Sequence, residues 1–222
     1  MDARWAPRLA ILAAAVFWAA LFGFGAMHPG YAHFTKAVSE LGAIGAPNAL
    51  AWNLIGFIIP GLLHAACGAQ LARTLDGRRT SLWWMFVAAG VGFAGTGVFP
   101  AVMQNGSPLM KAPSTIGHIA AMLVSSVFWL IAVVMIFQRA WRRDDWRSLR
   151  LPLVLATLVA FAGLAANVFH DSIPQLMYRP GLGQRLGFAG YFLWYIALSA
   201  WIAAPALIAR RAARRTPLIQ LN

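Results

Sequence analysis

Four of the five histidines, together with two acids and four basic residues, lie in three segments that interrupt long apolar runs, namely residues 28–48, 101–118 and 167–185. Histidine, acid and arginine side chains serve as general acids and bases, as metal ligands or as anion-binding groups. Where such groups border hydrocarbon they are costly and usually mark a function. The candidate ligand-binding residues, which include one amide a turn into the second apolar run, are His33, Glu40, Asn53, His118, His170, Asp171, Arg179 and Arg185.

One chemistry that suits these residues is binding, and with it transport or modification, of a lipid-like or small anionic ligand. The glycine-rich turn at residues 181–187 opens an apolar run, and the amides at a helix N-terminus favour an anion. The basic residues that would hold an anionic headgroup are Lys36, Lys111, Arg179 and Arg185.

A metal-dependent membrane-embedded hydrolase is the alternative enzyme class. His118, His170 and Asp171, with His33 or Glu40, offer enough ligands to hold a catalytic zinc ion and leave one position open. No HExxH or CxxC spacing supports this interpretation. A structural or assembly subunit of a membrane complex is the third alternative. Catalytic residues, metal ligands and cofactors stay unknown from the sequence.

Arg185 begins the last apolar run, where an unpaired cation is unfavourable at a helix N-terminus and at the edge of hydrocarbon. Because Asp171 and Glu40 are the acids expected on the same side of the membrane, we expect Arg185 to pair with one of them. His118 and His170 are expected to share a site with this pair.

His64 stands apart from the other histidines, near the middle of an apolar run and four residues after Pro60. It is either a ligand or proton-relay group or a neutral histidine bonded to a neighbouring helix. Haem ligation by His64 and His118 is disfavoured, because these residues would lie about 20 Å and about 3 Å below the starts of their helices.

Composition identifies the elements that must position these residues. The chain has 222 residues, of which 60% are hydrophobic and 11% charged, whereas soluble domains are nearer one half and one quarter. A soluble enzyme, a disordered chain and a disulfide scaffold are therefore excluded. We predict an all-α polytopic membrane protein, one domain of six transmembrane helices with a short interfacial helix at about residues 33–41, the spans covering residues 9–27, 50–72, 82–101, 116–137, 151–169 and 186–209.

The distribution of basic residues predicts the orientation. The net charge is +12. Of the 18 basic residues, 14 lie in short clusters between apolar runs, on the side of the membrane where six spans would place both termini. This pattern is that of positive-inside loops, so we expect both termini in the cytoplasm, location in a bacterial inner membrane, and membrane lipids rather than nucleic acid as partners. Protein partners stay unknown. The arginines that carry this prediction are Arg4, Arg8, Arg73, Arg78, Arg79, Arg139, Arg142, Arg143, Arg147, Arg150, Arg210, Arg211, Arg214 and Arg215.

Several short motifs resemble one family over nearly the whole chain. They are Ser39-Glu40-Leu41-Gly42-Ala43, Gly45-Ala46-Pro47-Asn48-Ala49, Trp52-Asn53-Leu54, Pro60-Gly61-Leu62-Leu63, Gly97-Val98-Phe99-Pro100, His118 and Gly183-Gln184-Arg185-Leu186-Gly187. The chain thereby resembles the prokaryotic membrane proteins of the domain-of-unknown-function family numbered 998. Members often carry an acid shortly after the Phe-Pro pair, where this chain has Ala101-Val102-Met103. The resemblance implies six spans and supplies no activity.

Overall fold

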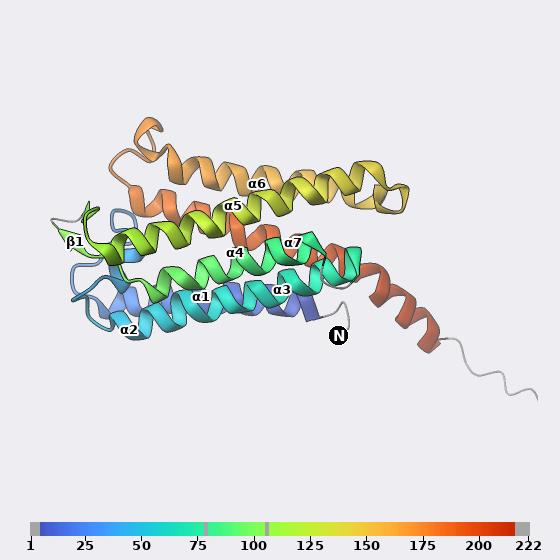
Figure 1. The fold of residues 1–222 in the computed structure, drawn as a ribbon, viewed down its shortest axis with the longest axis horizontal. Coiled ribbons are helices and arrows are strands. Elements are labelled where there is room, and N and C mark those ends of the chain that lie inside the picture. The colour runs from blue at the N-terminus through green and yellow to red at the C-terminus, as the bar shows by residue number, and fades with distance from the viewer. Residues whose placement is uncertain (1–4, 78–79, 105–106, 216–222) are drawn as a thin grey trace, which may run out of the picture.

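The computed structural model describes residues 5–77, 80–104 and 107–215, and for residue 145 and residues 205–215 it describes the backbone alone. Helices run back and forth in one bundle, and a two-stranded antiparallel hairpin joins two of them (Figure 1). The elements in order are α1 (Trp5–Met27), η1 (Val38–Gly42), α2 (Ala49–Trp52), η2 (Asn53–Ile58), α3 (Ile59–Asp76), α4 (Ser81–Val98), β1 (Met103–Gln104), β2 (Ser107–Pro108), α5 (Pro113–Arg142), η3 (Asp144–Leu149), α6 (Arg150–Val168), η4 (His170–Ser172) and α7 (Pro180–Arg215).

Among the described residues, six helical segments are long and apolar enough to cross a membrane, as the sequence predicted. The second is continuous from Ala49 to Asp76, with α2, the π-helical turn η2 and α3 joined end to end. The π-helical turn η2 ends immediately before Ile59-Pro60. The wider turn therefore lies where Pro60, which has no backbone N–H, removes a hydrogen-bond donor from the helix. Of the arginines used to predict orientation, Arg4, Arg78 and Arg79 lie outside the described residues.

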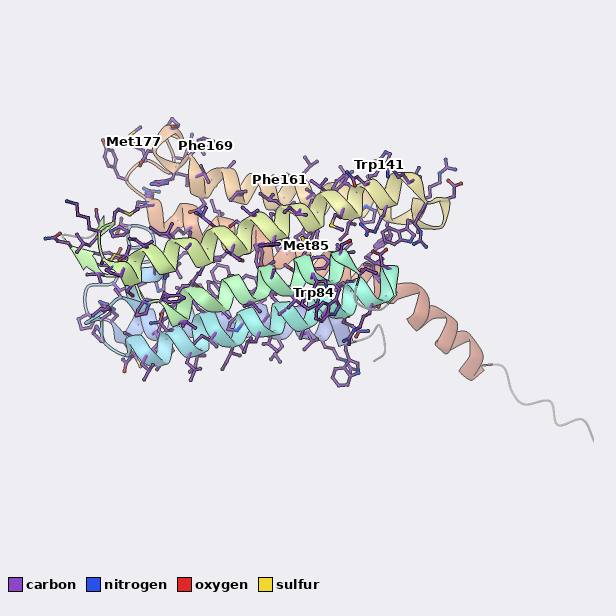
Figure 2. All side chains as sticks on the ribbon, in the orientation of Figure 1. Trp84, Met85, Trp141, Phe161, Phe169 and Met177 are labelled. Atoms are coloured by element: carbon purple, nitrogen blue, oxygen red, sulfur yellow. The ribbon has the colours of Figure 1, made fainter. Side chains whose placement is uncertain are left out.

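Apolar side chains cover the outside of the bundle. Trp84, Trp141, Phe161 and Phe169 are each at least 40% exposed, and Figure 2 shows them projecting away from the helices. A bundle whose surface is apolar along its length fits a hydrocarbon solvent. Its backbone polar groups need no partner in that solvent, because they bond to one another inside each helix.

Small residues set how closely the helices approach. A Cβ atom on Gly61 would lie 2.4 Å from the backbone nitrogen of Ala94, so α3 and α4 touch backbone to backbone. A Cβ atom on Gly163 would lie 2.3 Å from the carbonyl oxygen of Leu186, and α6 and α7 are in similar contact. Such close approach is how helices associate in lipid. Helix α5 packs along α4 and α6 packs along α7, while α5 and α6 make little contact with each other.

The connections at one end of the bundle are residues 28–48, 99–112 and 169–179, and we call this end the loop end (left in Figure 1). The prediction of an interfacial helix over residues 33–41 is wrong in extent, because the described helix is a short 3-10 turn from Val38 to Gly42. Residues 31–37 form turns instead. The physical reason is that Arg185 takes the carbonyl of Lys36 and the ring of His33 as hydrogen-bond partners, which holds this stretch in a loop.

Candidate functional site

The structure distributes the candidate residues of the loop end over three groups. His33, Glu40 and Arg185 lie in the first, His118 in the second, and His170 and Asp171 in the third. Asn53 lies between the first loop and the second membrane span, and Arg179 is exposed.

Arg185 holds the first loop against α7, in a group that we call the Arg185 clamp (Tyr31, His33, Lys36, Gly181 and Arg185). Its Nη1 donates to the carbonyl oxygens of Lys36 (3.1 Å) and Gly181 (2.7 Å). Its Nη2 donates to the hydroxyl of Tyr31 (2.8 Å) and to Nδ1 of His33 (3.0 Å). The side chain is only 6% exposed, so the guanidinium is held almost entirely by the chain itself.

The expected ion pair between Arg185 and Asp171 or Glu40 is wrong, since no carboxylate of the described residues lies within salt-bridge distance of Arg185. Glu40 is engaged elsewhere: it accepts the backbone N–H of Ala37 (2.8 Å) and pairs with Lys36 (3.2 Å). Carbonyl, hydroxyl and imidazole lone pairs supply negative potential to the cation, and the Tyr31 ring lies 5.7 Å from it.

Glycine at position 181 makes the clamp possible. A Cβ atom there would lie 2.3 Å from the carbonyl oxygen of Lys36, so any other residue would push the first loop away from α7. The contact continues at Gln184, whose Oε1 accepts the backbone N–H of Val38 (2.8 Å).

Two pKa values in the clamp are displaced. The pKa of Tyr31 is raised, chiefly because burial disfavours the phenolate. The pKa of His33 is lowered by burial and by the neighbouring charge of Arg185. Both shifts favour the neutral forms. A neutral His33 can accept from Arg185, and a neutral Tyr31 can accept from Arg185 while it donates to the carbonyl oxygen of Ala37 (3.1 Å).

His170 and Asp171 form a more exposed group in the third loop. His170 Nδ1 lies 3.0 Å from the carbonyl oxygen of Asn167, and Nε2 lies 3.3 Å from Asp171 Oδ1. The Asp171 side chain is 82% exposed, so this pair has the character of a loop surface contact.

Two polar residues inside the spans, Asn53 and His64, are buried in the packing between helices and loops. Asn53 donates from Nδ2 to the carbonyl oxygen of Gly42 (2.9 Å), which ties the first loop to η2. His64 is fully buried and stacks on Tyr195 with ring centroids 4.6 Å apart. Neither ring nitrogen of His64 has a hydrogen-bond partner within the described chain, so the expected bond to a neighbouring helix is not formed there.

His118 is positioned by the end of α4. Its Nδ1 lies 2.9 Å from the carbonyl oxygen of Thr96 and 3.0 Å from that of Phe99. The carbonyl of Thr96 would bond the N–H four residues on, but that residue is Pro100, which has none. The imidazole therefore supplies the donor that the proline removes, and this fixes the ring where α4 ends.

A cavity of about 130 Å³ lies beside this ring, and we call it the His118 cavity. It is enclosed by α4, α5, α6 and α7 with η1 and η2, where α5 and α6 separate. Its polar lining includes Ser39, His118, Ser125, Ser126, Asn167 and Gln184. Its apolar lining includes Phe57, Phe93, Met122, Trp129, Leu130 and Phe188.

The cavity has a direction and an opening. Three of the polar groups, His118, Asn167 and Gln184, come from the helix ends nearest the loop end, while Trp129 lies about 16 Å deeper than His118 along α5. Met122 and Ser126 line the cavity and are also exposed on the outside of α5. Because that face of α5 is apolar, the cavity borders the apolar outer surface of the bundle.

Among the described residues, the lining includes no Lys, Arg, Asp or Glu. Of the ligand-binding residues predicted from the sequence, the part of the lining that is described contains His118 alone. Sequence reasoning missed Ser125, Ser126 and Tyr191. The Ser-Ser pair inside an apolar run was a local signal for the two serines, whereas nothing in the sequence around Tyr191 pointed to the cavity.

Within the part of the chain that is described, no three His, Cys, Asp or Glu side chains are grouped to hold a metal ion. His118 and His170 have separate hydrogen-bond partners. His118 bonds to carbonyl oxygens of α4 and its C-cap, whereas His170 bonds to a carbonyl oxygen at the end of α6. The residues proposed as zinc ligands from the sequence are thus divided between different groups.

Comparison with known protein families places the chain in one of them. The model of the family described as "Protein of unknown function (DUF998)" matches residues 11–201. Among curated proteins and among solved structures, nothing matched the chain. The matched range runs from α1 into α7 and contains every residue that lines the His118 cavity.

Proposed function

The chain belongs to this family of membrane proteins, and we propose that it binds a lipid-like amphiphile in the His118 cavity. The observation that carries the proposal is the cavity itself, which is mostly apolar, has amide and imidazole groups at the loop end and is lined in part by residues that are exposed on the outer face of α5. A headgroup would lie near Asn167 and Gln184, and an acyl or alkyl chain would lie against Phe93, Trp129 and Leu130.

Of the two ligand classes expected from the sequence, the lipid-like one has the stronger support. An anionic headgroup needs a cation or several free donors in the site. The clamp hydrogen bonds engage both terminal nitrogens of Arg185, and Lys36 is paired with Glu40. The lining supplies hydroxyl, amide and imidazole groups, which suit an uncharged headgroup.

Ser126→Trp tests the proposal, with Val127→Trp as its matched control. Both positions are exposed on α5, but only Ser126 lines the cavity, so an indole there closes the opening without entering the helix packing. Protein purified in a mild neutral detergent is weighed by native mass spectrometry for bound amphiphiles. We expect wild type and Val127→Trp to retain them and Ser126→Trp to lose at least about four fifths. Equal retention by the two variants would place the bound amphiphile elsewhere.

The orientation of the bundle is part of the proposal. We infer that the loop end lies on the extracytoplasmic side of a bacterial inner membrane and that both termini are cytoplasmic, because arginines cluster at the opposite end. Reporter fusions after Asp76 and Asp144 should then report cytoplasm, and fusions after Gly42 and Gly181 should report the outside. One fusion on the opposite side would overturn this topology.

A further inference from the structure

The protonation pattern of His118 follows from its partners. A carbonyl oxygen only accepts hydrogen bonds, so the Nδ1 atom that lies 2.9 Å and 3.0 Å from two of them carries the hydrogen. No carboxylate of the described residues contacts this ring to stabilise an imidazolium. The neutral imidazole then has its lone pair on Nε2, and this tautomer is fixed by the end of α4.

The lone pair on Nε2 is available to a ligand. His118 lines the cavity and is itself 6% exposed, and its hydrogen bonds within the described chain all involve Nδ1. An acceptor that is desolvated in an apolar cavity favours a ligand that brings a donor. It disfavours a fully ionised carboxylate or phosphate, which offers lone pairs alone.

Neighbouring groups in the cavity complement a hydroxyl in particular. Asn167 and Gln184 line the cavity at the loop end, as His118 does, and Gln184 Oε1 accepts from Val38, so the Gln184 amide nitrogen can donate to a ligand. Ser125, Ser126 and Tyr191 lie deeper, since Ser125 is seven residues and about 10 Å beyond His118 along α5. A ligand hydroxyl is both donor and acceptor, so it can give its hydrogen to His118 and receive one from the amide of Asn167 or Gln184.

We propose that the His118 cavity selects uncharged amphiphiles that carry a free hydroxyl, and that Nε2 of His118 accepts the hydrogen of that hydroxyl. The class comprises long-chain alcohols and acylglycerols with an unesterified hydroxyl. This inference rests on the proposed function, since it specifies the headgroup of the amphiphile that the cavity binds.

Two substitutions separate the two nitrogens of the ring. In His118→Asn the side-chain amide nitrogen takes the place of Nδ1 and can still donate to the carbonyl of Thr96, but nothing replaces Nε2. In His118→Gln the longer amide reaches the place of Nε2 and offers an acceptor there. The first variant should keep the fold and lose hydroxyl recognition, and the second should keep part of the recognition.

The probes are hexadecanol and its methyl ether, which differ in the hydroxyl hydrogen and in mass. Equimolar amounts are added to full-length protein in neutral detergent, and native mass spectrometry counts each bound species. We expect wild type to prefer the alcohol about fivefold to tenfold, the ratio that one hydrogen bond supplies. His118→Asn should bind both probes about equally, with an unchanged melting temperature as evidence of folding.

The outcomes distinguish this inference from the proposed function. If wild type binds both probes equally and Ser126→Trp abolishes both, amphiphile binding stands and hydroxyl selection is wrong. If the preference survives in His118→Asn, another group recognises the hydroxyl and the role of His118 is wrong. If neither probe binds wild type above the level of Ser126→Trp, the cavity is no amphiphile site and both proposals fall.

Discussion

The Arg185 clamp and the His118 cavity lie at the same end of the bundle, and both contain an ionisable side chain that is 6% exposed. They differ in how much hydrogen-bonding capacity the chain itself uses. Both terminal nitrogens of Arg185 bond within the chain and its buried Nε has no partner among the described residues, whereas His118 engages one ring nitrogen and lines a cavity. Unused hydrogen-bonding capacity at a cavity wall, rather than residue type, is what separates the proposed binding group from a structural one.

Mutations in the two regions should also have different effects on stability and on ligand binding. A residue of the clamp connects the first loop to α7, so changing it should lower stability and affect ligand binding only through the loop. A residue of the cavity should change ligand binding with a small effect on stability. Gln184 belongs to both regions, because it accepts from Val38 and lines the cavity.

The largest expected effect is that of Arg185→Ala. It leaves the Lys36 and Gly181 carbonyls and the Tyr31 hydroxyl without their donor, so the free energy of unfolding should fall by about 3 kcal/mol or more. Thermal unfolding in detergent measures this loss. Arg185→Lys should recover a part, since a lysine cannot reproduce the planar two-sided donor pattern.

Arg179→Ala is the matched control, because that side chain is exposed and lies six residues away in the same turn region. Its melting temperature should stay close to that of wild type. An Arg185→Ala protein that is equally stable would mean that the clamp holds nothing.

Gly181→Ala should destabilise less, by about 2 kcal/mol, because its Cβ would lie 2.3 Å from the carbonyl oxygen of Lys36 and must displace the first loop. Gly23→Ala is its counterpart, since a Cβ on Gly23 in α1 meets no atom within 4 Å. Melting temperatures of the two variants decide the point: a Gly23→Ala protein that is the less stable of the two would contradict tight docking of the loop on α7.

The helices could be predicted from the sequence because their signal is local. An apolar run of some 20 residues is sufficient to indicate a span, and each of the six predicted spans overlaps a described helix. The stretch 33–41 was predicted poorly because its conformation depends on Arg185, some 150 residues later in the chain. Hydrogen bonds of that range leave no periodicity in the loop itself.

The candidate site was predicted only in part, because local signals identify a residue but not its distant partners. Residue type identified His118 and Arg185 as candidate site residues, and the structure buries both near the loop end of the bundle, in separate groups. Their partners were not predictable from charge alone, since Arg185 bonds to neutral oxygens and nitrogen and Glu40 bonds to its own loop. Pro100 was a usable local signal for the orientation of His118.

Gln184→Ala sharpens the comparison because it should affect both regions. Loss of the acceptor for the Val38 N–H should lower the free energy of unfolding by about 1 kcal/mol, and loss of a lining amide should weaken amphiphile retention severalfold. Melting temperature and native mass spectrometry on the same preparation measure the two effects. Gln175→Ala, at an exposed position in the third loop, should change neither. A Gln184→Ala protein with normal retention would separate the clamp from the cavity.

The smallest expected effect is a pH dependence carried by His33. Its Nδ1 accepts from Arg185, so protonating the ring would remove the acceptor and place two cations 3.0 Å apart. Its other neighbours are the Tyr31 and Phe22 rings, 5.2 Å and 5.3 Å away, and the Lys36–Glu40 pair lies in the same loop. Burial and Arg185 lower the pKa of His33 in the folded protein.

A histidine with a lowered pKa binds protons more readily in the unfolded chain, where its pKa is about 6.5. The free energy of unfolding should therefore fall as the pH drops from about 6.5 to the folded pKa, and this contribution should be constant above about 6.5. In His33→Asn the amide oxygen can accept from Arg185 but does not titrate, and the other four histidines are present in both proteins. The melting temperature of wild type should thus fall more than that of His33→Asn between pH 7.5 and pH 5. Parallel curves would show that Arg185 does not depend on a neutral His33, and the clamp would then rest on Tyr31 and the two carbonyl oxygens.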